Sequence, residues 1–175
     1  MILIGTFYLY LCISELDWDE MKFLELNMVT LRSFKYTDAN VLKQYKYTSM
    51  SIQEIQDMIC DWNKLEYEGK YFEMFAVENN GEIVGTISLY QHSDSVVSIG
   101  PEIFPVFQRQ GFGREAMYLT LDLAKSRKYK IVFQQIQKDN MPSINLHKSL
   151  EFETDHYCYK NKNGKEVLIF IKPLF

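Results

Sequence analysis

The segment Gln108-Arg109-Gln110-Gly111-Phe112-Gly113 lies between a run of residues with strand propensity and an amphipathic helix. Its two glycines, one residue apart, allow a tight turn and the close approach of a ligand, because neither carries a Cβ atom. The following helix presents its first free N–H groups and the positive end of its dipole to an anion. The segment therefore predicts a loop that binds a phosphate group.

The residues around this loop predict an α/β domain with a mixed, mostly antiparallel sheet of about seven strands flanked by four helices. Asn80-Gly81 between two apolar runs indicates a hairpin, and Ser51 with Glu54 forms a capping-box pattern. Strands are expected at residues 26–34, 71–78, 82–90, 96–104, 131–137, 153–160 and 166–171. Helices are expected from a cap at Thr37 or Asp38 to Tyr45, over 51–62, over 112–128 and after Asn140.

Two known nucleotide-binding motifs are alternative interpretations of these glycines. A P-loop requires G-x-x-x-x-G-K-[ST], and the lysine and hydroxyl residue are missing from this chain. Residues 111–116 do satisfy the dinucleotide pattern G-x-G-x-x-[GA]. That pattern belongs on the first turn of a parallel βαβ unit, whereas antiparallel hairpin signals flank it here. A nicotinamide-dependent oxidoreductase is the alternative that this spacing leaves open.

Residues 108–113 resemble the Q/R-x-x-G-x-G/A loop of the GCN5-related N-acetyltransferases. Residues 99–105, Ile-Gly-Pro-Glu-Ile-Phe-Pro, are similar to the strand that precedes that loop, including its final proline. Residues 140–152, Asn-Met-Pro-Ser-Ile-Asn-Leu-His-Lys-Ser-Leu-Glu-Phe, resemble the N-x-x-A-x-x-L-Y-x-x-x-G-F segment of the same family. The order of expected elements agrees with the family from about residue 29 onward.

This resemblance implies that the phosphate ligand is the pyrophosphate of acetyl-CoA. It also implies that a bulge splays the strand ending at Phe104 from the strand at 131–137, so that the peptide-like pantetheine arm pairs between them. The N–H of Ile103 would polarise the thioester carbonyl. The residues expected to contact the cofactor are Ile103, Phe104, Gln108, Arg109, Gln110, Gly111, Phe112, Gly113, Arg114, Asn140 and Ser143.

The family transfers the acetyl group by direct attack of an amine, so a base and an acid are required. Glu102 adjoins the expected thioester and is the candidate base, with a water chain as the alternative. Some relatives carry a glutamate on the next strand, where this chain has Gln135, which cannot act as a base. His147 replaces the family's tyrosine and can protonate the leaving thiolate. Gln135 and His147 leave open a non-catalytic module that binds acyl-CoA.

The segment at 140–152 carries two further expectations. Asn140 should cap a helix that has Pro142 in its first turn, besides hydrogen-bonding the cofactor arm. Glu151 stands where the family usually has glycine, at a position that often turns with positive φ. A glutamate there predicts local strain or a different turn.

The length of 175 residues is typical of one domain, expected here as an acetyltransferase domain over 28–175. Residues 1–27 fall outside the resemblance and are expected to be an N-terminal extension, either an extra strand or a non-native start. The apolar stretch over residues 1–13 is too short to span a bilayer, so no membrane partner is expected.

The net charge and the cysteine spacing indicate which classes of partner and which compartment to expect. The net charge of -4 argues against a nucleic-acid partner. Cys12, Cys60 and Cys158 show no C-x-x-C spacing, which favours reduced thiols in a cytoplasmic protein over disulfides or a metal site. The expected partner is an amine of a small molecule or peptide, and a homodimer is a further expectation. The sequence does not name the acceptor.

Overall fold

The computed structural model describes residues 29–175, and an eight-stranded sheet runs through them. The strands are β1 (Val29–Ser33), β2 (Glu66–Tyr67), β3 (Lys70–Asn79), β4 (Glu82–Ser93), β5 (Val96–Ile103), β6 (Ile131–Gln137), β7 (Tyr159–Lys160) and β8 (Glu166–Pro173). Their order is β1-β3-β4-β5-β6-β8-β7, with β2 paired to β3 off this path. Only β5 and β6 are parallel among these strand pairs. The predicted fold class is confirmed, while the predicted extension at 1–27 lies outside the described residues.

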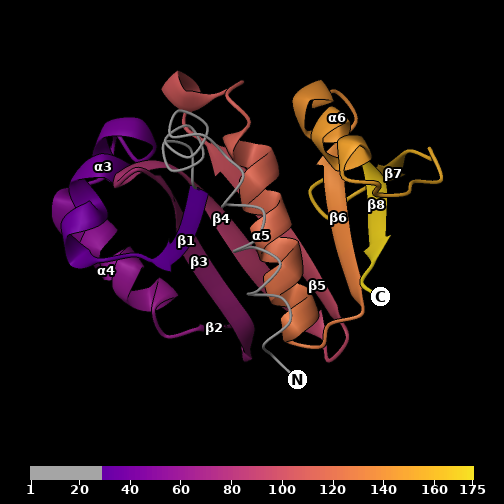
Figure 1. Cartoon of the computed structure of the whole chain (residues 1–175), viewed down its shortest axis with the longest axis horizontal. Coiled ribbons are helices and arrows are strands. Elements are labelled where there is room, and N and C mark those ends of the chain that lie inside the picture. The colour runs from indigo at the N-terminus through magenta and orange to yellow at the C-terminus, as the bar shows by residue number, and fades with distance from the viewer. Residues whose placement is uncertain (1–28) are drawn as a thin grey trace, which may run out of the picture.

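Helices cover both faces of this sheet (Figure 1). The helices are α3 (Ala39–Tyr45), α4 (Ile52–Trp62), α5 (Phe112–Ser126) and α6 (Met141–Ser149), with short 3-10 turns at Tyr36–Asp38 and Pro105–Phe107. Phe75 and Val77 of β3 face one core, which α5 and α6 cover. Ala76, between them, faces a second core under α3 and α4. Alternate residues of a strand point to opposite faces, so the two cores lie on opposite sides of the sheet.

Local sequence signals explain several element boundaries. The Oγ of Ser51 accepts a hydrogen bond from the N–H of Glu54 at 3.2 Å, and the Glu54 carboxylate accepts one from the N–H of Ser51 at 2.7 Å. This capping box starts α4 as predicted. Asn80 and Gly81 both have positive φ, 51° and 81°, which is the backbone of a tight two-residue hairpin between β3 and β4.

Two local predictions are wrong. The side chain of Asp38 does not cap α3; its carboxylate accepts hydrogen bonds from the N–H of Lys35 and the guanidinium of Arg32 instead. The strand expected at 153–160 is reduced to a single bridge at Glu153 and the two residues of β7. Asp155 explains the interruption, because its carboxylate binds groups within the segment and competes with the strand ladder.

Candidate functional site

The parallel pair of β5 and β6 separates after two residue pairs. Val96 pairs with Ile131 and Val97 with Val132, and no further β5–β6 pair follows within the described residues. Beyond that point β5 stays paired with β4 as far as Ile103, and β6 stays paired with β8. The two parts of the sheet therefore diverge toward the end where β5 leads into the glycine loop (Figure 1).

The divergence occurs without the bulge that the resemblance implied near the end of β5. The register between β4 and β5 is unbroken from the pair Gln91–Val97 to the pair Gly85–Ile103, and its one irregularity lies between Gln91 and Ser93. The strands separate because β5 stays paired with β4 and β6 stays paired with β8, without a register shift at the end of β5.

The backbone of Ile103 faces the opening between β5 and β6. The N–H of the next residue, Phe104, donates to the carbonyl of Val84 on β4 at 3.0 Å. Because successive backbone groups of a strand point to opposite sides, the N–H and C=O of Ile103 point away from β4. The amide of Gln108 confirms this direction for the C=O, which it reaches at 2.9 Å.

Two predicted cofactor residues, Phe104 and Gln108, form hydrogen bonds with other groups of the protein. Phe104 is fully buried; its N–H binds Val84, and its C=O accepts from the N–H of Phe107 at 2.9 Å. The prediction that Phe104 contacts the cofactor is therefore not supported by its surroundings. The side chain of Gln108 closes the loop onto Ile103, which gives it a bracing role in the loop.

The loop backbone places the start of α5 for anion binding. Gly111 is the N-cap of α5 with φ 93°, and Arg109 also has a positive φ, 64°. The C=O of Gly111 accepts from the N–H groups of Arg114 and Glu115. The N–H groups of Phe112 and Gly113 have no acceptor among residues 29–175 and are the first free donors of the helix.

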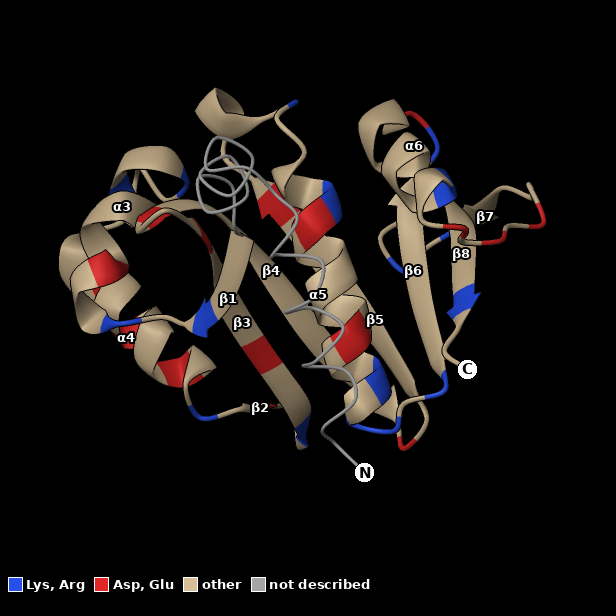
Figure 2. Ribbon diagram, viewed as in Figure 1, with Lys and Arg blue, Asp and Glu red and all other residues tan. Residues whose placement is uncertain are grey.

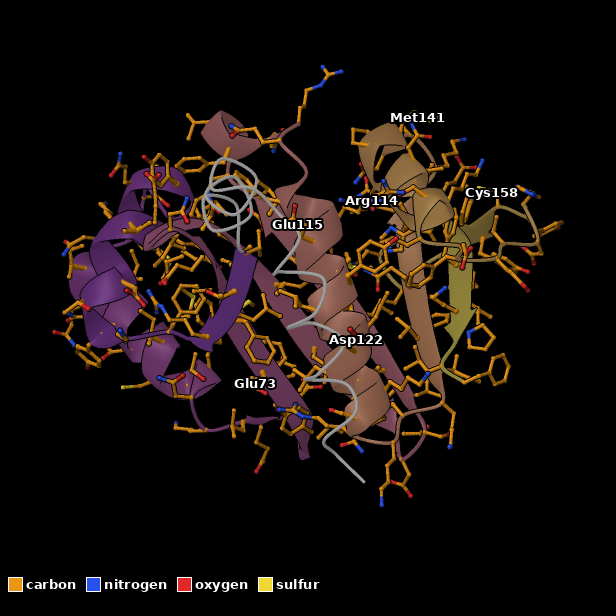
Figure 3. All side chains as sticks on the ribbon, viewed as in Figure 1. Glu73, Arg114, Glu115, Asp122, Met141 and Cys158 are labelled. Atoms are coloured by element: carbon orange, nitrogen blue, oxygen red, sulfur yellow. The ribbon has the colours of Figure 1, made fainter. Side chains whose placement is uncertain are left out.

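The start of α5 lies between β5 and α6. A Cβ atom added to Gly113 would lie 3.4 Å from Cγ1 of Ile103 and 3.9 Å from Cδ2 of Leu146, which are ordinary van der Waals contacts with both elements. The guanidinium of Arg114 donates to the carbonyl of Ser149 at the end of α6 at 3.1 Å, and Figure 3 shows Arg114 on the side of α5 that faces α6. Arg114 therefore joins the two helices.

Charges of both signs surround the loop. Arg109 and Arg114 are exposed beside it, while Glu115 is exposed in the first turn of α5 (Figure 2). An acidic residue at a helix N-terminus is stabilised by the helix dipole. The Glu115 carboxylate would also lie beside a bound phosphate, because one of its oxygens is 3.8 Å from the Cβ position of Gly111.

Glu102 is half exposed and is held by an ion pair that the sequence did not suggest. The Nζ of Lys46, just after α3, lies 2.7 Å from one carboxylate oxygen of Glu102 and 3.2 Å from the Oγ1 of Thr86. Thr86 is the register partner of Glu102 on β4. Lys46 stands in no recognisable motif and is 40 residues from Thr86 in the chain, so only the fold brings these groups together.

The start of α6 forms as predicted. The Oδ1 of Asn140 accepts from the N–H of Ser143 at 3.2 Å, and a proline stands in the first turn. This cap fixes the position of Asn140 and Ser143 on the α6 side of the diverging strands. Their predicted contacts with the cofactor arm stay predictions.

His147 lies inside the core. Its ring is 1% exposed and packs edge-on against Phe152, with a ring-centroid distance of 4.8 Å. The Nδ1 atom is 2.8 Å from the C=O of Ser143, so Nδ1 carries the proton and donates it to this carbonyl. The Nε2 atom is buried without a hydrogen-bond partner among the described residues. A buried, neutral ring of this kind does not support the predicted role as the acid.

The burial of His147 has a measurable consequence. Desolvation lowers the pKa of this ring in the folded chain, while an unfolded histidine titrates near 6.5. The stability that depends on the neutral ring is therefore complete above about pH 6.5 and is lost as the pH falls toward the folded-state pKa. We expect the free energy of unfolding, measured with urea between pH 7.5 and 5, to fall more steeply in the wild type than in His147→Phe. Equal slopes would contradict this.

Glu151 has the positive φ that its position predicts. Its φ is 61°, and its carboxylate is 90% exposed, 3.6 Å from Lys172. An exposed pair at this distance contributes little, whereas a left-handed backbone costs an ordinary residue about 1–2 kcal/mol. We expect Glu151→Gly to raise the free energy of unfolding by about 0.5–1 kcal/mol, because glycine removes the strain but is more flexible when unfolded. In the control Glu151→Ala the strain remains, so a gain equal to that of glycine would rule out this explanation.

Residues 29–175 contain neither a metal-binding cluster nor a membrane-spanning helix. No three His, Cys, Asp or Glu side chains in this range gather so as to hold a metal ion. None of the helices in the same range is both long and apolar enough to cross a bilayer.

The divergent strands and the free donors at the start of α5 have the arrangement that the family resemblance implied. Comparison with known families agrees: the model of the Acetyltransferase (GNAT) family matches residues 38–152. The chain therefore belongs to the GNAT family. None of the curated proteins compared with the chain matches it in sequence.

Solved structures share the fold at low sequence identity. RimJ of Mycobacterium smegmatis, in complex with CoA-disulfide, has a TM-score of 0.72 at 16% identity, covering 83% of this chain and 81% of its own. RimL, a ribosomal L7/L12 α-N-protein acetyltransferase in complex with coenzyme A, has a TM-score of 0.70 at 17% identity, covering 83% and 94%. A dodecameric spermidine N-acetyltransferase from Vibrio cholerae has a TM-score of 0.67 at 15% identity, covering 83% and 94%. Likeness at this level establishes the fold alone.

Proposed function

We propose that residues 28–175 form a domain that transfers an acetyl group from acetyl-CoA to a primary amine of a small molecule or a protein. The observation that carries this proposal is the opening between β5 and β6, which ends at a helix N-terminus with free N–H donors. When bound, acetyl-CoA supplies an activated thioester and an anionic pyrophosphate of the kind these donors suit.

The backbone supplies most of the binding groups in this proposal. The N–H groups of Phe112 and Gly113 bind the pyrophosphate, with Arg109 adding positive charge nearby. The N–H of Ile103 points into the opening and stabilises the negative charge that develops on the thioester oxygen, a contribution worth a few kcal/mol. Backbone donors of this kind are already oriented before the ligand arrives.

In this proposal the amine nitrogen attacks the thioester carbon, a C–N bond forms, and the C–S bond breaks to release the CoA thiolate. Glu102 accepts the proton that the amine loses, directly or through water. Lys46 positions the Glu102 carboxylate by binding one of its oxygens and leaves the other for the substrate. Because His147 is buried, solvent is the proposed source of the proton that the thiolate takes up.

A second candidate is the non-catalytic module that binds acyl-CoA. The burial of His147 and the amide at Gln135 favour it, since neither side chain provides an acid or a base at the opening. This candidate and the transferase share the same loop and differ only in turnover.

The deciding experiment measures free thiol release from acetyl-CoA with a panel of amino acids, polyamines, aminoglycosides and peptides. Glu102→Gln should reduce turnover with any accepted amine while acetyl-CoA affinity, measured by calorimetry, is kept. Binding of acetyl-CoA without thiol release from any amine would favour the binding module. Thermal stabilisation of the protein by NAD and not by CoA would overturn both candidates and favour the nicotinamide-dependent oxidoreductase instead.

A further inference from the structure

A pocket of about 480 Å³ opens at the end of the sheet opposite the glycine loop. It lies between the end of α4, the short strand β2 and the adjoining ends of β3 and β4, and its lining residues are Met58, Asp61, Trp62, Glu66, Tyr67, Phe72 and Tyr90. Tyr90 and Gly85 lie on the same strand, about 17 Å apart at the usual rise per residue, and Gly85 is the partner of Ile103. The pocket is therefore separate from the proposed acetyl site.

Three aromatic rings in this lining form a triangle. The ring centroids of Tyr67 and Phe72 are 6.1 Å apart, those of Tyr67 and Tyr90 6.2 Å, and those of Phe72 and Tyr90 6.5 Å. The planes are inclined to one another by 56–70°. A cation above the centre of such a triangle would lie within about 6 Å of all three centroids, which is the range of a cation–π interaction.

No lysine or arginine among residues 29–175 lies over these three rings. The two cation–π contacts among residues 29–175 are formed by Lys46 with Tyr47 and by Arg127 with Tyr71. The lysines closest in sequence to the triangle have other partners, since Lys64 pairs with Asp61 in the pocket wall and Lys70 donates to the carbonyl of His92. Tyr90 also packs edge-on against His92, which is not part of the pocket lining, with ring centroids 5.0 Å apart. No lysine or arginine of the described part forms a cation–π contact with the three rings.

Two acidic residues, Asp61 and Glu66, line the pocket, and Lys64 pairs with the first of them. Glu66 has no ion-pair partner within residues 29–175, and it lies in the pocket wall beside Tyr67. The adjoining helix α4 carries Glu54, Asp57 and Asp61 but no lysine or arginine, as the acidic positions in Figure 2 show. An apolar, aromatic pocket with an unpaired carboxylate in its wall suits a cation that has an apolar surface.

We propose that this pocket binds a small alkylammonium ion, with the charged nitrogen over the faces of Tyr67, Phe72 and Tyr90 and with Glu66 nearby. A fully methylated nitrogen fits this site best, because it is weakly hydrated and needs no hydrogen-bond acceptor. Such a nitrogen has no N–H and cannot be acetylated, so this site is distinct from the acceptor site of the proposed function.

The test compares choline with 3,3-dimethyl-1-butanol, its neutral analogue of the same shape, by calorimetric titration of the full chain. We expect choline to bind about tenfold more tightly than the alcohol. Because Tyr67 is 56% exposed, its replacement leaves the core intact. Tyr67→Leu should weaken choline binding about fivefold, whereas Tyr67→Phe, which keeps the ring, should stay within about twofold of the wild type.

Acetyl-CoA affinity measured on the same variants serves as the folding control and should not change. The proposal is overturned if the neutral alcohol binds as tightly as choline, if Tyr67→Leu binds choline like the wild type, or if choline produces no binding heat. None of these results depends on turnover, so failure here and failure of the proposed acetyl transfer can be told apart.

Discussion

Replacement of Gly111 by valine is expected to abolish acetyl-CoA binding, with an affinity loss of about 100-fold or more. Gly111 caps α5 with φ 93°, a conformation that is a severe outlier for a β-branched residue. An added Cβ would meet only the Glu115 side chain at 3.8 Å, so the effect comes from the backbone and not from crowding. The loop would leave its present shape, and the free N–H groups of Phe112 and Gly113 would no longer converge.

The matched control for this substitution is Gly69→Val. Gly69 also has a positive φ, 73°, with no atom within 4 Å of an added Cβ, but it lies in the β2–β3 turn at the other end of the sheet. Both variants should lose a similar amount of thermal stability, and only Gly111→Val should lose calorimetric binding of acetyl-CoA. Wild-type affinity in Gly111→Val would remove this loop from the binding site.

Replacement of Gly85 by alanine should lower the free energy of unfolding by about 2–3 kcal/mol. An added Cβ at Gly85 would lie 2.4 Å from the carbonyl oxygen of Glu102 and 2.9 Å from the Cα of Ile103. These are backbone atoms, so β4 and β5 must move apart, and the residue proposed to polarise the thioester moves with them. Urea unfolding gives the stability, and thiol release per folded molecule gives the effect on the site.

Gly100→Ala is the control for Gly85→Ala on the same pair of strands. There the added Cβ would meet only the Oγ of Ser88, at 2.8 Å, and a hydroxyl can rotate away. We expect a stability loss of less than about 1 kcal/mol and no change in thiol release. If both alanine variants behaved alike, the close approach at Gly85 would not be what holds Ile103 in place.

The features that the sequence predicted are those encoded by neighbouring residues. The Ser51–Glu54 cap and the cap at Asn140 depend on side chains within three residues of the backbone they bind, and the hairpin depends on the positive φ of Asn80 and Gly81. The glycine loop between β5 and α5 is of the same kind, because φ at Gly111 and the helix start are local properties. Such signals can be recognised in the sequence without knowledge of the tertiary structure.

The features that escaped sequence reasoning depend on distant segments. Lys46 meets Glu102 only because α3 packs over β4 and β5, and no spacing in the sequence connects them. His147 matched a motif position, but the packing of α6 on β8 directs its ring into the core. The aromatic triangle is assembled from β2, β3 and β4. Phe72 and Tyr90 were expected on two separate strands and Tyr67 on none, and the register that pairs Phe72 with Tyr90 could not be read from the sequence.

The short contact between β5 and β6 also has a mechanical consequence. At one end, the carbonyl of Ser95 accepts from the N–H groups of both Lys130 and Ile131, next to the two paired residues of each strand. At the other end, the bond from Arg114 to Ser149 ties α5 to α6. Besides its packing in the core shared with α5, the segment from β6 to the C-terminus is thus joined to the rest of the domain by backbone pairing at one end and by a side-chain hydrogen bond at the other. The backbone amides of this segment should exchange with solvent as one cooperative unit. Loss of the hydrogen bond from Arg114 to Ser149 would widen the opening that separates β5 from β6.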